Sequence, residues 1–117
     1  MALYLTADRG RFNEWEITIG DAAGGNAVIA ANDIVYAKIG RTGDELLFEV
    51  GSDADTANGS SITAENPTTL GIAEDDIDFP SGIYDIEVCI MDTSEQRMKK
   101  AERGVFVLRD SMGTEAY

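Results

Sequence analysis

The sequence predicts an all-β protein, an antiparallel β-sandwich of roughly seven to nine short strands. The clearest observation is the segment from Phe79 to Asp92, which opens with a turn and then carries core-type apolar residues at every second position from Tyr84 to Ile90. A period of two indicates a strand with one face in a core. Turn signals recur about every ten residues, and no stretch has the period of a long amphipathic helix. Because a lone strand is not stable, the other segments must supply its neighbours.

Residues 1–117 suit a single domain, with residues 111–117 expected to form a flexible tail. The hydrophobic content of 44% is enough for one core, and it excludes a fully disordered chain despite a net charge of −13. We expect no membrane-spanning segment, because no apolar run is long enough, and the N-terminal residues do not have the pattern of a signal peptide.

The first half of the chain contains several strand patterns. Trp15, Ile17 and Ile19 share one face of an extended segment, which predicts a half-buried strand. Residues 34–39 are rich in β-branched and aromatic residues and are apolar on both faces, which predicts an interior strand. A loop containing Gly43 then leads to the expected hairpin partner. The strands expected in this half are residues 3–6, 15–19, 34–39 and 46–50, with another short one at 27–31.

The segment from Phe79 to Asp92 begins with a turn, because Pro80 fixes its own φ and Gly82 accepts unusual backbone conformations. Tyr84 follows this turn, a position that suits a tyrosine corner or simply a buried phenol with its hydroxyl at the rim. Two sets of side chains face opposite ways: Tyr84, Ile86, Val88 and Ile90 toward the core, and Asp85, Glu87, Cys89 and Met91 away from it.

The remaining strands are weaker or more polar. Residues 61–64 predict a short edge strand, and residues 68–72 predict another strand after Pro67. Residues 97–103 carry the densest basic charge of the chain, and we interpret them as a solvated edge strand on which lysines oppose unwanted pairing. The last strand is expected at residues 104–109.

The charge and the residue types exclude several functions. A net charge of −13 repels nucleic acid and anionic membranes, so neither is expected as a partner. The chain lacks histidine, the commonest general base and zinc ligand. The single cysteine, Cys89, cannot form an intrachain disulfide and is interpreted as a structural thiol on an apolar strand. We therefore expect no catalytic residues and no cofactor.

Two acidic clusters are the remaining candidates for chemistry. Asp53, Asp55 and Asn58 imitate part of a calcium loop, but the spacing is wrong and the closing glutamate is absent, so they are only weak metal candidates in a solvated loop. The second cluster, residues 74–76 with Asp78, is consecutive on a loop and has no sign of an enclosing cleft. It is interpreted as a solvated loop or as a surface that meets the basic segment, within the molecule or on a neighbour.

Several segments together are similar to the immunoglobulin-like domain at the N-terminus of phage baseplate upper proteins and of related tail and virion proteins. That family has a strand with a basic end, a Pro-Gly-x-Tyr-x-x-x-Val turn and strand, and a final Gly-x-Phe-x-Val strand. Here Ser81 separates Pro80 from Gly82, a small departure. The matching segments are Trp15 to Asp21 with Asp33 to Arg41, then Phe79 to Val88, then Arg103 to Asp110.

The resemblance implies an immunoglobulin-like sandwich and a non-enzymatic structural component of a bacteriophage particle. It would be made in the host cytoplasm, reside in the virion, and assemble with itself and with other virion proteins. Its place in the tail, baseplate, neck or capsid stays open. The candidate assembly residues are Arg97, Lys99, Lys100 and Arg103 on the basic segment, and Glu74, Asp75 and Asp76 on the acidic one.

Two other functional classes remain as alternatives. A small carbohydrate- or calcium-binding module is suggested by Tyr4, Trp15 and Tyr36 together with the acidic loops. An acidic glycosidase using Asp75 or Asp78 is the least favoured, because paired carboxylates need a cleft around the sugar.

Overall fold

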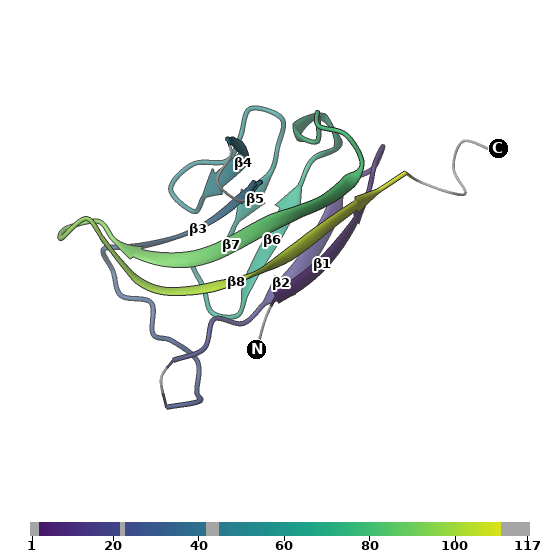
Figure 1. Ribbon diagram of the computed structural model, residues 1–117. Helices are drawn as coiled ribbons and strands as arrows, with labels where there is room; N and C mark the ends of the chain where they lie inside the picture. Colours follow the sequence, from purple (N-terminus) through teal and green to yellow (C-terminus); the bar gives the residue numbers. More distant parts are fainter. Residues whose placement is uncertain (1–2, 22, 42–44, 111–117) are drawn as a thin grey trace.

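The computed structural model describes residues 3–21, 23–41 and 45–110 (Figure 1). Within these ranges the chain forms eight strands and one 3-10 turn. The predicted flexible tail, residues 111–117, lies outside the described residues. The elements are β1 Leu3–Asp8, β2 Asn13–Ile17, β3 Asp33–Gly40, β4 Leu46–Gly51, β5 Ser61–Ile62, β6 Thr68–Ile72, η1 Glu74–Asp76, β7 Gly82–Asp92 and β8 Arg97–Arg109.

The strands form two sheets that pack as a β-sandwich, which confirms the predicted fold class. One sheet has five strands in the order β1-β8-β7-β3-β4, and the other has three in the order β2-β6-β5. The predicted interior strand, β3, lies between β7 and β4. In Figure 1 the β7–β8 hairpin extends well beyond the smaller sheet, so the five-stranded sheet is the longer of the two layers.

The first strand departs from the predicted antiparallel arrangement. β1 pairs with β8 in parallel, from Leu3 beside Gly104 to Asp8 beside Arg109. The reason is connectivity: the strand after β1 in sequence, β2, belongs to the other sheet, so β1 has no hairpin partner in its own sheet. Gly104 permits the close approach, since a Cβ there would lie 1.7 Å from the Leu3 carbonyl oxygen.

Three other segments differ from their predicted form. The two strands expected at residues 97–109 are one continuous strand, β8. The expected strand at residues 27–31 is a loop. The Ala27 amide in this loop donates a hydrogen bond to the carbonyl of Ile19, two residues after the end of β2. The edge strand expected at 61–64 is reduced to Ser61–Ile62.

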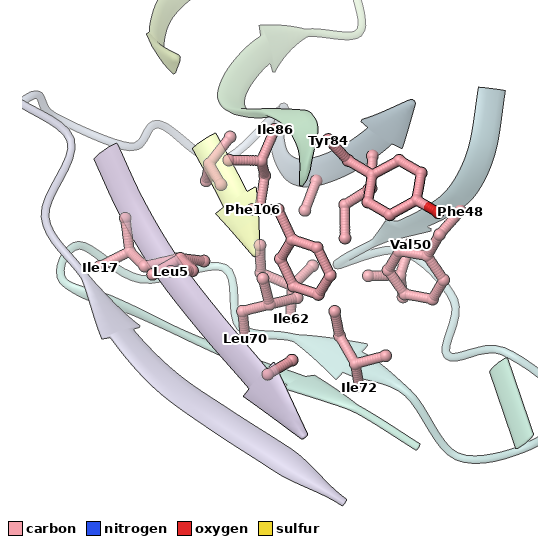
Figure 2. Packing of buried hydrophobic residues seen from close by; sticks show 14 of the residues in the cluster. Leu5, Ile17, Phe48, Val50, Ile62, Leu70, Ile72, Tyr84, Ile86 and Phe106 are labelled. Atoms are coloured by element: carbon pink, nitrogen blue, oxygen red, sulfur yellow. The ribbon is translucent and has the colours of Figure 1, made fainter. Parts of the chain in front are cut away.

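The core lies between the two sheets and is built on the inward face of β7. Tyr84, Ile86, Val88 and Ile90 are all buried, as their alternation predicted. Figure 2 shows Ile86 and Phe106 from the larger sheet meeting side chains of the smaller one, with Leu70 among them. Burying each such side chain contributes about 1.5–3 kcal/mol to folding, so this interface accounts for the pairing of the two sheets.

Tyr84 also fixes the turn before its own strand. Its hydroxyl donates a hydrogen bond to the Pro80 carbonyl. Its ring packs edge-on against Phe79 with a centroid separation of 4.9 Å. This is the geometry of a tyrosine corner, the first of the two readings that the sequence allowed.

We predict that Gly104→Ala destabilises the fold by about 1–3 kcal/mol, because the added methyl group overpacks the junction of β1 and β8. Urea denaturation measures the loss, and amide hydrogen exchange in β1 should accelerate more than in β2. Gly20→Ala is the matched control, since a Cβ at Gly20 has only ordinary contacts, the nearest at 3.6 Å. Equal effects of the two substitutions would contradict the close approach.

Candidate functional site

The outer face of the larger sheet, turned away from the core, carries an exposed apolar patch. Tyr4 and Val105 are register partners, as are Ile83 and Val107. Tyr4 is 67% exposed and Ile83 is 73% exposed, while Val105 and Val107 are partly exposed between them. An antiparallel sheet facing water is normally polar on that side. We call these four residues the apolar patch.

A line of alternating charge crosses the same face. Lys38 on β3 is the register partner of both Glu49 on β4 and Glu87 on β7, and Glu87 is the partner of Arg103 on β8. The Lys38 and Glu49 side chains lie 3.7 Å apart, and those of Arg103 and Glu87 lie 2.6 Å apart. The resulting order, negative, positive, negative, positive, is called the charge row.

The charge row separates the apolar patch from a second apolar region around Tyr36 and Cys89. Both side chains are on the outward face but buried, and the Lys38 ammonium lies 4.8 Å from the centre of the Tyr36 ring. Burial raises the pKa of the Cys89 thiol and of the Tyr36 phenol, so both stay protonated at neutral pH. Cys89 is thus buried and neutral, as a structural thiol should be. Ile34 and Met91 border this region and line a hollow of about 450 Å³.

The charge row also borders a hollow of about 490 Å³. Gly40 contributes no side chain to it, and Arg41 and Asp85 lie at its edge. The outer face is therefore uneven, with a hollow beside the charge row.

The predicted basic segment is largely neutralised within the molecule. Its three ion pairs among the described residues are Arg97 with Glu95 (2.9 Å), Lys99 with Asp33 (2.8 Å) and Arg103 with Glu87 (2.6 Å). Lys99 lowers the pKa of the buried Asp33 carboxyl, with help from the Ala30 amide. Lys100 is partly buried beside a hollow of about 340 Å³.

The predicted acidic cluster has a structural role that the sequence did not reveal. Asp76 accepts hydrogen bonds from Thr56 (2.5 Å), from Asn58 (2.8 Å) and from the Ser60 hydroxyl. It therefore holds the loop between β4 and β5. Burial alone would raise the pKa of Asp76, but these hydrogen bonds together lower it. The alternative that this cluster meets the basic segment within the molecule is wrong for Asp76, whose described partners all lie in that loop.

The two acidic clusters that the sequence presented separately thus come together through Asn58 and Asp76. Asn58 uses its amide as a donor, and Asp53 and Asp55 are exposed. In the described part of the chain, no three His, Cys, Asp or Glu side chains are grouped so that they could hold a metal. Glu74 and Asp75 of the assembly candidates are exposed.

Sequence reasoning missed the apolar patch, although a signal was present. Residues 104–108 form an unbroken apolar run, and such a run places apolar side chains on both faces of a strand. The run by itself predicts only a strand at residues 104–109 and does not say which of its faces stays uncovered. Of the aromatic residues suggested for ligand binding, Tyr4 is exposed, whereas Tyr36 is buried and Trp15 packs edge-on against Phe106 at 5.9 Å.

Comparison of the chain with protein-family models and with curated proteins gave no match. Among the described residues no helix has the length and apolar character needed to cross a membrane.

We predict that Asp76→Asn lowers the free energy of unfolding at neutral pH by about 1–3 kcal/mol, because hydrogen bonds to a charged group are replaced by weaker ones. The Asp76 pKa lies below its ordinary value of 3.8 in the folded protein, so its contribution is complete above that pH and is lost as the pH falls further. Urea denaturation from neutral pH to below pH 3.8 should show the two proteins converging. Asp75→Asn is the control, and an equal loss there would refute the assignment.

Proposed function

We propose that this protein is a non-enzymatic structural component of a bacteriophage particle, of the tail, baseplate, neck or capsid, that acts by protein–protein contact. The observation that carries the proposal is the apolar patch on the solvent side of the larger sheet. Burying apolar surface contributes about 25 cal/mol per Å² of favourable free energy, so contact with a partner that covers the apolar patch is favoured.

We further assign the sandwich to the immunoglobulin-like class. Two features support this: a larger sheet in which the first strand runs parallel to the last, and the tyrosine corner at Tyr84. The disulfide that joins the sheets in antibody domains has no counterpart, since Cys89 is the chain's single cysteine. The space between the sheets is filled by hydrophobic side chains, Ile86 and Ile17 among them.

The resemblance of the turn and strand segments to phage baseplate and tail proteins supports the particle as the setting. In a particle, each contact is repeated by symmetry, so many weak interfaces hold together what one could not. A net charge of −13 keeps the free subunit soluble before assembly.

One observation favours a second candidate function, a carbohydrate-binding module. The Tyr4 ring is exposed beside other apolar side chains, and an exposed aromatic ring can stack on the apolar face of a sugar. Titration calorimetry with a glycan panel, and with calcium for the loop of Asp53 and Asp55, tests this alternative. Heats abolished by Tyr4→Ala would favour it.

We predict that mass spectrometry of purified phage particles detects this protein and that Ile83→Asp prevents its incorporation, because a charge at the most exposed side chain of the apolar patch opposes desolvation. Val28→Asp is the matched control, since Val28 is 78% exposed on the loop between β2 and β3 and is not part of the apolar patch. Circular dichroism verifies that both variants fold. Absence from particles, or normal incorporation of Ile83→Asp, would contradict the proposal.

A further inference from the structure

The outer face carries a pattern that is complementary to itself. Along the charge row the order is Glu49, Lys38, Glu87 and Arg103, from β4 to β8. Reversing this order gives the opposite sign at every position. A copy of the face turned end for end across its strands therefore presents a positive charge wherever the original has a negative one.

We propose that the partner of the outer face is a second copy of this chain, packed face to face about a two-fold axis that runs parallel to the strands, midway between β3 and β7. The inference rests on the proposed function insofar as that names the outer face as the contact surface. Because two-fold contacts are isologous, each pairing occurs twice.

The proposed axis pairs the row with itself. A rotation about this axis exchanges β3 with β7 and β4 with β8, and it keeps each residue at its level along the strands. Lys38 then faces Glu87 of the other copy, and Glu49 faces Arg103. The outer pair is the more available, because Glu49 is 49% exposed and Arg103 is 70% exposed. Complementary charges of this kind fix the register of an interface.

The rows on either side follow the same symmetry. One level along the strands, Leu46, Gly40, Asp85 and Val105 are successive register partners. The rotation places the exposed Leu46 of one copy over Val105 of the other, and Asp85 of one copy over Gly40 of the other, which has no side chain to clash with it. On the far side of the charge row, Ile34 and Met91 are register partners within one chain. The rotation places Ile34 of each copy over Met91 of the other.

The other two-fold arrangement of the two faces is disfavoured. An axis in the plane of the sheets but perpendicular to the strands places each member of the charge row opposite the same residue of its partner. Like charges then meet at Glu49 and Arg103, and juxtaposed like charges oppose association. Twisted sheets pack with their strands about 30° apart, so the pairs nearest the axis align best.

The test uses two charge reversals at the ends of the row, Glu49→Arg and Arg103→Glu. Sedimentation velocity over a concentration series should show a dimer for the wild type, with each variant associating about a hundredfold more weakly, since each places like charges opposite each other. An equimolar mixture of the two variants should recover the dimer, because Arg at 49 of one copy meets Glu at 103 of the other. Crosslinking across 49 and 103 should occur between copies.

Arg11→Glu serves as the control for charge reversal, since Arg11 is exposed in the turn between β1 and β2, 4.0 Å from Asp8, and is not a member of the charge row. It should dimerise as the wild type does. A monomeric wild type, unaffected single variants, or a mixture that stays monomeric would each overturn the two-fold dimer. If the wild type is monomeric while Ile83→Asp still blocks incorporation into particles, this inference fails and the proposed function stands.

Discussion

Successive side chains of a strand must point to opposite faces, and this constraint governs both halves of the molecule. On β7 it sends Tyr84, Ile86 and Val88 into the space between the sheets, where they meet the smaller sheet. The same constraint commits the intervening residues to the outer face. These residues therefore lie on the side of the sheet that faces away from the core. They include the apolar Ile83 and the charged Glu87, and no requirement of the core explains either choice.

Charge is used locally in this protein. The basic residues of β8 look like a docking patch in the sequence, but their carboxylate partners come from β3, β7 and the hairpin turn. Exposed ion pairs of this kind contribute little to stability, typically below about 1 kcal/mol each. The order of the charges along the charge row is more informative than the strength of the ion pairs. Alternation across neighbouring strands keeps like charges from being direct neighbours, and it leaves a negative charge at the β4 end of the row and a positive charge at the β8 end.

The sequence was sufficient for features set by local pattern. The alternation on β7 and the interior character of β3 depend on neighbouring residues, and both were predicted. The corner at Tyr84 was one of two alternatives that the sequence left open, because the turn before β7 is visible in the sequence but the partner of the hydroxyl is not. The parallel pairing of β1 was not, because periodicity identifies a strand but does not name its partner. The link between Asn58 and Asp76 was missed for the same reason, since it joins segments that only the tertiary fold brings together. The apolar patch was missed although the apolar run at residues 104–108 was visible.

One irregularity of β8 has a consequence for crowding. Ile90 is the partner of Lys100, and Met91 is the partner of Met98, so Lys99 is an extra residue that bulges from the ladder and pairs with the buried Asp33. Among the described residues, no strand pairs with this half of β8 on the side away from β7. A regular strand edge with unpaired backbone groups is a template for fibril growth, and a bulge with an inward-pointing lysine disrupts that template. Copies of the chain can thus be gathered densely without seeding amyloid from this edge.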